Sequence, residues 1–427
     1  MSSRIIAVKH RVKQTANSEA HPTLVTIVTG GEMKHLELAT EQDELDFVNG
    51  EYPTSYRAWV VLEDKLQDFK PWHVKWKGKG EDRVVHQVPA TYEGLRKDDT
   101  VLMQLGGSGD RLASAMARTL MPVSGMVCRV PPHVTSARRG DRDMSDNDVL
   151  LELWEQDSDS FYIIDEPEIR RIAVREAFEN RREAQLARMG CQQRLLQREI
   201  GKIFIGGVLK REIALEDSFE SLRANSPILE ALKKEEDEAT KLLERAVKAS
   251  RPWVLFEPIE GVGPAIAGAL IASIGDVRRF ATYQKLMAFS GLHPLTRDGK
   301  KFGKGEAREA GDSIFPRRRR NQLSNWNQPA KQALYLLGDQ FNRRPGSYWG
   351  AKLKANKVSL RIAHPEEVIE DGKKRYTNGH IHKMAIWKTL RQFVRWLWRA
   401  WMNLENGKPV VQPKWKEDTV SDLAKAA

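Results

Sequence analysis

Cysteine is scarce in this sequence, which contains Cys128 and Cys191 and no other cysteine. The two residues stand in separate segments with no CxxC spacing, so the sequence supports neither a disulfide framework nor a thiolate metal site. Long apolar runs are also missing, because no uncharged stretch approaches the length that spans a membrane and the first residues are charged. We therefore expect a soluble protein of the reducing cytoplasm, with no membrane partner.

Acidic residues are too few to balance the basic ones, since 58 Asp and Glu face 69 Lys and Arg and give a formal net charge of +11. Such an excess favours a polyanionic partner, because binding to phosphates releases condensed counterions. A basic but otherwise ordinary enzyme would have the same charge, because net charge does not determine fold. The chain has 427 residues, enough for two or three domains. The position of the charges along it must therefore show whether the protein binds a polyanion.

The N-terminal part, residues 1–160, has the pattern of an α/β domain. Short β-rich runs are separated by glycine, proline and charged turns; they read RIIAVKH, TLVTIV, MKHLELA, AWVVLE, RVVHQV, TVLMQL and GMVCRV. A helix is expected at residues 110–120, between the last two runs. This order of strand, helix and strand predicts that those two strands are parallel. The sequence leaves open whether residues 1–55 belong to this domain or extend it.

The remaining sequence is helical in pattern. Residues 161–250 carry long charged helices with apolar residues at helical spacing, which predicts a helical hairpin or coiled coil. This segment is either a dimerisation arm or a spacer packed on its own domain, and the irregular heptads do not separate the two. Residues 251–405 are helical and basic, with an amphipathic helix expected at residues 381–401, and residues 406–427 form a tail.

The stretch IEGVGPAIAGALIASIGDVRRF at residues 259–280 has the form of a helix-hairpin-helix. Gly261 and Gly263 admit a tight turn, and Pro264 suits the start of a helix whose backbone N–H groups approach a phosphate. Any glycine-capped helix turn is the simpler alternative. Basic side chains nearby are further phosphate ligands, unless their loop only aids solubility; they are Arg278, Arg279, Lys300, Lys301, Lys304, Arg317, Arg318, Arg319 and Arg320.

Motifs in residues 251–401 carry a likeness to a known family; they are EGVGPAIAGALIASIGDVRRF, then YQKLMAFSGLHP at residues 283–294, and GHIHKMAIWKTLRQFVRWLW near the end. This part resembles the C-terminal domain of the bridge-RNA-guided DEDD insertion-sequence transposases, the group that includes the Piv and MooV invertases. The resemblance implies an RNase-H-like (RuvC-like) α/β domain with an Asp-Glu-Asp-Asp set, followed by an all-α helix-hairpin-helix domain that supplies a serine nucleophile. It also implies Mg²⁺ as cofactor, DNA and a structured guide RNA as partners, and a homodimer or higher oligomer.

The resemblance assigns Asp143 and Asp146 as the last two acids of that set and as Mg²⁺ ligands. Carboxylates that converge from a strand and a helix can hold Mg²⁺ ions and stabilise both oxygens of a phosphoryl displacement. Their spacing of three residues puts both acids on one face of a helix. The alternative is structural, because the acidic run DRDMSDND would also cap a helix that begins near Ser145.

Two other positions depart from the family pattern. Gln104 stands where the family has its glutamate, and Asp110 replaces it only if the loop between them folds back. The expected Ser-Gly pair is missing, so Ser313, in AGDSIFPRRRR, is the nearest candidate nucleophile. The arginines beside Ser313 would favour a phosphodiester, whereas its structural alternative is a turn residue.

The identity of the first acid depends on which run forms the first strand. If RIIAVKH is that strand, Lys9 or His10 replaces the acid; if AWVVLEDK is, Glu63 or Asp64 takes its place. The sequence thus leaves three functions open. They are a Mg²⁺-dependent transposase or site-specific recombinase, a non-catalytic descendant that binds nucleic acid, and a nuclease that cuts junctions without rejoining them.

Overall fold

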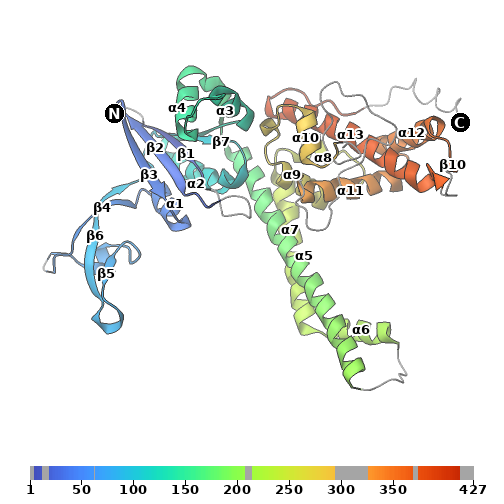
Figure 1. The fold of residues 1–427 in the computed structure, drawn as a ribbon, viewed down its shortest axis with the longest axis horizontal. Helices are drawn as coiled ribbons and strands as arrows, with labels where there is room; N and C mark the ends of the chain where they lie inside the picture. The colour runs from blue at the N-terminus through green and yellow to red at the C-terminus, as the bar shows by residue number, and fades with distance from the viewer. Residues whose placement is uncertain are drawn as a thin grey trace. The chain divides into compact units, whose positions relative to one another are not determined.

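The computed structural model describes residues 4–11, 19–61, 63–206, 214–293, 326–368 and 374–413. The chain divides into two compact units, one formed up to Ile169 and the other from Arg170 onward. The first unit contains two β-sheets, and the second is mostly helical (Figure 1). Among the described residues, no helix is both long and apolar enough to cross a membrane.

A mixed six-stranded sheet forms the centre of the first unit, with the strand order β3-β2-β1-β7-β8-β9. Strands β1, β7 and β8 are parallel, whereas β2, β3 and β9 pair antiparallel with their neighbours. The parallel pairing of β7 and β8 confirms the predicted crossover, and the strand order is compatible with the predicted RNase-H-like fold. The strands are β1 (Ile5–Lys9), β2 (Thr23–Thr29), β3 (Glu32–Leu38), β7 (Thr100–Gln104), β8 (Met126–Val130) and β9 (Tyr162–Ile163).

Helices pack on both faces of this sheet, because alternate residues of a strand point to opposite sides. Val101 and Met103 of β7 pack with residues of α1 and α2 on one face. Leu102 packs with residues of α4 on the other face. Strands buried on both faces read as continuous apolar runs, which is why the sequence alone indicates a strand at TVLMQL. The helices are α1 (Glu41–Val48), α2 (Asp110–Leu120), α3 (Pro132–Arg139) and α4 (Asp146–Gln156).

A second sheet of three strands, in the order β4-β6-β5, is inserted between α1 and β7. Its two ends meet, since a Cβ on Gly94 would lie 2.5 Å from the Gly50 Cα. Glu93 ties it to the main sheet, because its Oε1 lies 2.7 Å from the Arg4 Nη1. Although burial opposes the charge, hydrogen bonds from Arg4 and Lys34 lower the pKa of Glu93 to about 2. The strands are β4 (Tyr52–Ala58), β5 (Lys75–Lys77) and β6 (Val84–Glu93).

The first strand of the six-stranded sheet is formed by RIIAVKH, and the alternative that starts at AWVVLEDK is wrong. Strand β4 ends at Ala58, and the run expected to form a strand there turns instead. Asp64 closes this turn by accepting the Val60 N–H at 2.8 Å and by pairing with Arg57. Such a side chain offers the backbone an alternative to strand pairing. Strands β1, β2 and β3 lie within residues 1–55, so this part of the chain belongs to the sheet.

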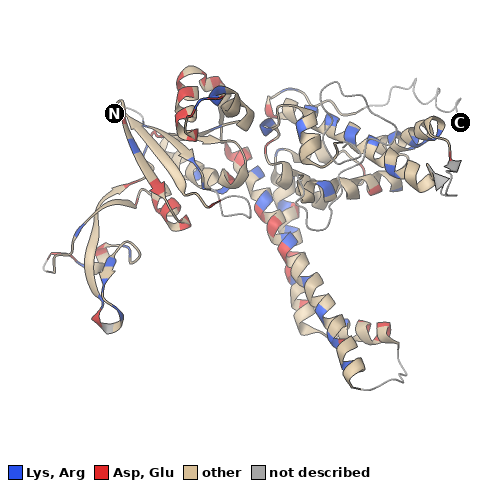
Figure 2. Cartoon of the chain, viewed as in Figure 1, with Lys and Arg blue, Asp and Glu red and all other residues tan. Residues whose placement is uncertain are grey.

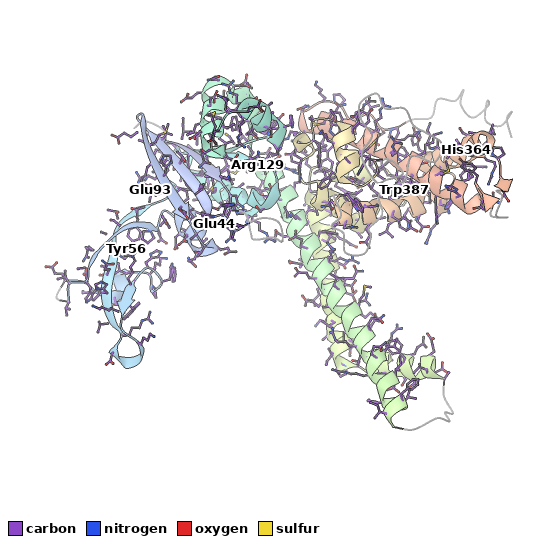
Figure 3. All side chains as sticks on the ribbon, in the orientation of Figure 1. Glu44, Tyr56, Glu93, Arg129, His364 and Trp387 are labelled. Atoms are coloured by element: carbon purple, nitrogen blue, oxygen red, sulfur yellow. The ribbon has the colours of Figure 1, made fainter. Side chains whose placement is uncertain are left out.

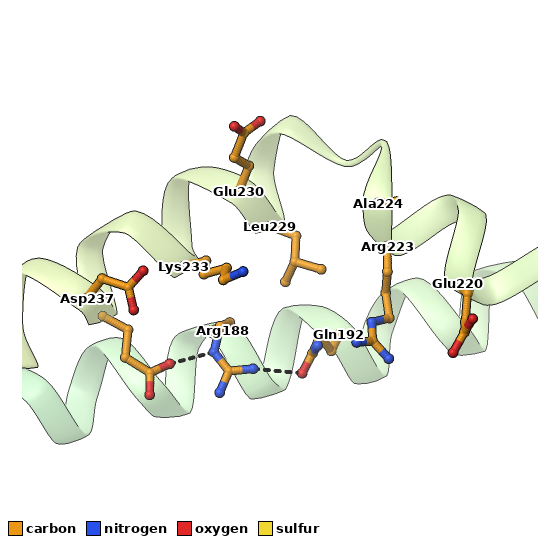
Figure 4. A pocket seen from close by; sticks show the side chains of 10 residues that line it. Arg188, Gln192, Glu220, Arg223, Ala224, Leu229, Glu230, Lys233 and Asp237 are labelled. Atoms are coloured by element: carbon orange, nitrogen blue, oxygen red, sulfur yellow. Dashed lines mark hydrogen bonds and ion pairs between the residues drawn. The ribbon is translucent and has the colours of Figure 1, made fainter.

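Helix α5 leads from the first unit into a helical hairpin, as the sequence predicts for this region. Glu236 of α7 pairs with Arg188 and, at 3.5 Å, with Arg181 of α5. A polar cavity of about 720 Å³ lies between these helices and α6, and in it Arg188 also donates to Gln192 (Figure 4). The lining mixes both signs of charge, as does the whole hairpin (Figure 2). The helices are α5 (Glu166–Ile205), α6 (Leu215–Ala224) and α7 (Pro227–Ala249).

The rest of the second unit is a helical bundle with an aromatic core. Phe256, Phe341, Phe393 and Trp401 are among the buried residues of this core. Helix α13 contains the amphipathic helix predicted at residues 381–401. The remaining elements are α8 (Trp253–Phe256), α9 (Pro264–Ile274), α10 (Tyr283–Phe289), α11 (Gln328–Arg343), α12 (Tyr348–Ala363), α13 (Asn378–Glu405), β10 (Glu367–Val368) and β11 (Lys374–Arg375). Short 3₁₀ turns are η1 (Leu66–Asp68), η2 (Gly80–Asp82), η3 (Gly107–Gly109), η4 (Met121–Val123), η5 (Ser158–Ser160) and η6 (Val277–Arg279).

Candidate functional site

A pocket of about 240 Å³ opens where the carboxyl ends of β1 and β7 meet the start of α4. Neighbouring parallel strands end at the same edge of a sheet, and open α/β sheets bind their ligands outside these ends. Lys9 ends β1, Gln104 ends β7 and Asp146 begins α4. The glycine-rich loop at residues 106–109 and Thr135 of α3 lie beside them in the pocket. This is the edge at which the predicted acids should converge.

Asp146 is held in this pocket by two cations. Its Oδ2 lies 2.9 Å from the Lys9 Nζ, and its Oδ1 accepts a hydrogen bond from Arg139 of α3. Burial alone would raise the pKa of Asp146, but the hydrogen bonds from Lys9 and Arg139 lower it below its ordinary value. The carboxylate is therefore ionised at neutral pH, and both of its oxygens are already engaged.

Gln104 is the neighbour of Lys9 across the two central strands, because Val8 and Met103 are partners in the parallel register. The Gln104 Nε2 donates a hydrogen bond to the Thr135 Oγ1 at 2.8 Å. An amide side chain brings a neutral oxygen where a glutamate would bring a charged carboxylate. The strand ends thus present an ammonium and an amide to the pocket.

The other acids that the sequence singles out do not line this pocket. Asp143 is exposed before the start of α4, and Glu63 is exposed in the turn after β4. Asp110 is buried at the start of α2, where its Oδ1 accepts a hydrogen bond from the Arg129 Nη1 at 2.8 Å. Arg129, labelled in Figure 3, is 1% exposed and also pairs with a glutamate of α5. Of the predicted acids, the structure brings Asp146 to the pocket and leaves the others elsewhere.

A second candidate site is the turn that precedes α9. Gly261 has a φ of +87°, which favours glycine, and a Cβ there would lie 2.8 Å from the Arg344 Nη1. Gly263 is the N-cap residue of α9 and Pro264 its first residue, and no side chain caps this helix end. Gly263 and Ala265 are exposed. The positive end of the α9 macrodipole is therefore accessible, close to a guanidinium.

Arg278 is enclosed by its neighbours, and its predicted role as a phosphate ligand stays a prediction. It is 7% exposed, and its Nη2 lies 2.6 Å from the Asp276 Oδ2. Arg171 of α5 lies 3.0 Å from the same oxygen. Arg278 is therefore engaged within this buried group of charges. Arg279 is partly exposed, and its guanidinium lies over two phenylalanine rings, 5.0 and 5.2 Å from their centroids.

The turn before α9 lies within a stretch that matches a known family. Residues 254–317 match the model of the Transposase IS116/IS110/IS902 family. This segment is of the IS110 transposase type. The IS110-type segment starts in α8, includes α9 and α10, and ends beyond residue 293, outside the described part of the chain. No curated protein matches the chain. A transposase of this type implies DNA as partner and suggests the use of a divalent metal.

The residues of the pocket do not fit the Mg²⁺ that the IS110-type family suggests. Mg²⁺ demands oxygen ligands in near-octahedral geometry, commonly with one or two carboxylates and substrate phosphates. Here the single carboxylate, Asp146, is shared by Lys9 and Arg139. Within the described ranges, no group of at least three His, Cys, Asp or Glu side chains is placed to hold a metal ion. An ammonium at the end of β1 would repel a divalent cation.

Several residues that the sequence singles out lie outside the described residues. These are Ser313 and the basic residues Lys300, Lys301, Lys304, Arg317, Arg318, Arg319 and Arg320. Their predicted roles, as nucleophile and as phosphate ligands, stay predictions.

The sequence interpretation missed that two basic helices, α12 and α13, lie side by side. Helix α12 carries four Lys and Arg and no acid, and α13 carries five and one acid, Glu405. The Glu405 side chain is 4% exposed, and burial raises its pKa, so it adds little negative charge to the surface. Figure 2 shows blue segments along both helices. The sequence signal for this basic surface was residues 348–363, a helical segment with three lysines, one arginine and no acid.

Proposed function

We propose that this protein binds DNA as a transposase-type protein. In this proposal, the pocket at the ends of β1 and β7 binds no Mg²⁺. The observation that carries the proposal is the ion pair between Lys9 and Asp146. Metal-dependent phosphoryl transfer needs carboxylates that converge on the ions, and this edge has an ammonium in their place. The Lys9 ammonium and the Arg139 guanidinium neutralise Asp146, so its charge needs no metal. Binding without strand cleavage is the function that this geometry supports best.

An RNase-H-like fold of the first unit is part of the proposal. The antiparallel strands β3, β2 and β1 are followed in the sheet by the parallel strands β7 and β8. This order supports the fold, and it puts the ends of β1 and β7 next to each other at the pocket. The three-stranded sheet of residues 52–93 would then be an insertion into that fold.

A helix-hairpin-helix formed by α8, the glycine turn and α9 would be the DNA-binding element. Its support is the uncapped, exposed start of α9 and the Arg344 guanidinium beside Gly261. A phosphate oxygen would accept hydrogen bonds from the first N–H groups of α9. The cations of α12 and α13 would neutralise further phosphates. Such contacts do not depend on DNA sequence, so target choice would need a second partner, for which the structured guide RNA implied by the resemblance is our candidate.

We also propose a homodimer or higher oligomer, assembled through the helical hairpin. Leu186 and Met189 of α5 are 57% and 49% exposed, and Ile228 and Leu242 of α7 are 67% and 52% exposed. Exposed apolar side chains on a polar helix hairpin indicate a contact surface. The dimerisation arm is thus preferred to the spacer among the two alternatives for this region.

A second candidate function is strand transfer by a transposase or site-specific recombinase. The observation that favours it is the match to the IS116/IS110/IS902 family, whose name is that of transposases. In this candidate, Ser313 would attack DNA beside the arginines at residues 317–320. Because the pocket beside Lys9 does not fit Mg²⁺, this function would need a site of strand cleavage elsewhere in the protein.

We expect the purified full-length protein to bind duplex DNA and four-way junctions equally well with Mg²⁺ and with EDTA, and to cut neither. Raising the salt from about 50 to about 200 mM should weaken binding roughly 100-fold if about four phosphates are neutralised. Binding is measured by fluorescence anisotropy and cutting by denaturing gels.

Two outcomes of this experiment would support strand transfer instead. Cutting that requires Mg²⁺ and is lost in Asp143→Ala/Asp146→Ala would contradict the metal-free proposal. A covalent adduct between protein and DNA that disappears in Ser313→Ala would identify the nucleophile and restore the recombinase function.

We expect Ala265→Glu to weaken duplex DNA binding about tenfold without unfolding the protein. Ala265 is exposed in the first turn of α9. A carboxylate there stabilises the helix by roughly 0.3–1 kcal/mol through the macrodipole, but repels a phosphate at the same end. Affinity and melting temperature are measured together. The control is Ala265→Gln, which has the same size and no charge; an equal loss in both variants would mean that shape, not charge, matters at this helix end.

A further inference from the structure

The inserted sheet of β4, β6 and β5 has little core of its own. Its buried residues include His73, Val74, Val88 and Pro89, whereas other apolar side chains remain accessible. The exposed fractions are 55% for Trp72, 60% for Val84 and 39% for Tyr92. In the described part of the chain, α1 is the helix that packs beside this sheet, against β4. Several side chains of β5 and β6 therefore remain exposed to solvent.

Cations lie over aromatic rings throughout this insertion. Among the described residues of 52–93, four cations lie within 6.0 Å of a ring centroid. The distances from cation to ring centroid are 3.6 Å for Lys75 over Tyr56, 4.7 Å for Arg83 over Trp76, 5.5 Å for Lys70 over Trp72 and 6.0 Å for Arg57 over Phe69. Tyr56 is labelled on this sheet in Figure 3. The rings and the positive charges thus share one surface.

The charge of this surface is concentrated around β5. Residues 69–80, FKPWHVKWKGKG, contain four lysines and no acid. Asp68 directly precedes this run, and Asp64, in the turn after β4, is paired with Arg57, whose hydrogen bond lowers the pKa of Asp64 to about 2. We call residues 70–83 the lysine-tryptophan segment. Near its end the segment contains the acids Glu81 and Asp82, and the Lys70 Nζ lies 3.2 Å from the Glu51 Oε2. Lys75, Lys77 and Lys79 are exposed, so they complement a polyanion.

We propose that the lysine-tryptophan segment binds single-stranded nucleic acid. Unpaired bases expose flat faces that stack on aromatic rings, while a duplex keeps its bases stacked on one another. Bases stack on Trp72 and Trp76, and the cationic groups that now lie over or beside these rings bind the phosphates. Single-stranded RNA and single-stranded DNA share this chemistry. The proposal goes beyond DNA binding by the second unit, because it concerns different residues in a different unit.

The test uses the full-length protein and labelled oligo(dT) and oligo(U) of about 20 nucleotides, longer than the span of one typical single-strand site. We expect Trp76→Ala to weaken binding about tenfold, as removal of one stacking ring usually does. Trp76→Phe should keep most of the affinity, because it keeps a stacking ring. Lys77→Gln/Lys79→Gln should weaken binding and reduce its salt dependence, whereas Lys233→Gln/Lys241→Gln on α7, with the same change in charge, should do neither.

Duplex DNA is titrated in the same samples, so that the two proposals can fail separately. A loss confined to single strands supports the lysine-tryptophan segment, and the stronger of the two oligonucleotides identifies RNA or DNA as its ligand. If Trp76→Ala changes neither affinity, or weakens duplex and single strand equally, the proposal is overturned while duplex binding by the second unit stands. No binding of either oligonucleotide by the unmodified protein also overturns it.

Discussion

The variant that combines Lys9→Asp with Gln104→Glu is expected to bind Mg²⁺, which the unmodified protein is not expected to do. Both substitutions put carboxylates at the ends of β1 and β7, which are adjacent parallel strands and so lie about 4.8 Å apart. Asp146 loses its ion pair with Lys9 and becomes available as a third ligand. Arg139 still competes for it, so a Kd of about 1 mM, at the weak end for oxygen-ligand sites, is expected. Isothermal titration with MgCl₂ measures this.

The matched control for this variant is Lys9→Asn with Gln104 unchanged. It removes the ammonium without adding an acid, and so should not create a Mg²⁺ site. If the unmodified protein binds Mg²⁺ as tightly as the double variant, the metal-free interpretation of the pocket is incorrect. If the double variant folds and still binds no Mg²⁺, the three positions do not converge as an RNase-H-like edge requires.

Replacing Asp276 with alanine is expected to destabilise the second unit by about 3–5 kcal/mol. Asp276 is 2% exposed, and its carboxylate is shared by the buried guanidinium groups of Arg171 and Arg278. It also accepts the Arg278 N–H at 2.8 Å and so caps the turn η6. The loss of one acid therefore leaves two enclosed cations without the carboxylate they share. Hydrogen exchange of peptides from α9 and α10 measures the effect locally, which suits a chain of two units.

Asp339→Ala provides the comparison for Asp276→Ala. Asp339 pairs with Arg343 at 2.8 Å across one turn of α11, but its side chain is 42% exposed. Exposed pairs of this type contribute roughly 0.3–0.5 kcal/mol, so little change is expected.

A comparison of stability with DNA affinity also separates the two roles considered for Arg278, which are partner of Asp276 and phosphate ligand. A variant Arg278→Ala that loses DNA affinity while keeping full stability would show that Arg278 binds phosphate rather than Asp276.

The parts of the fold that the sequence predicts correctly are those in which one segment determines its own structure. The crossover from β7 through α2 to β8 is visible as two apolar runs around an amphipathic helix. The turn before α9 is visible because Gly261 has a positive φ, which strains other residues, and Gly263 stands at the N-cap of α9. Helix α13 is visible from its periodic apolar face. Local patterns of this kind need no knowledge of distant residues.

The state of the pocket could not be predicted in this way, because it depends on residues far apart in the chain. Lys9 and Asp146 are brought together only by the packing of α4 beside β1. The choice between RIIAVKH and AWVVLEDK required knowing which run pairs with β7. The carboxylate of Asp110, at the start of α2, looked available until the fold placed it against Arg129 of β8. Pairing partners follow from topology, and a single sequence leaves topology open.

Because Gly50 and Gly94 approach each other closely, the inserted sheet is a cassette, meaning a segment that could be removed or replaced as one piece. Both ends of the segment leave the parent fold at one spot, where a side chain on Gly94 would collide with the backbone of Phe47 and Gly50. A short bridge between these two glycines would close the parent fold without moving α1 or β7. Removal or exchange of the cassette as one piece would therefore leave the six-stranded sheet and its helices in place.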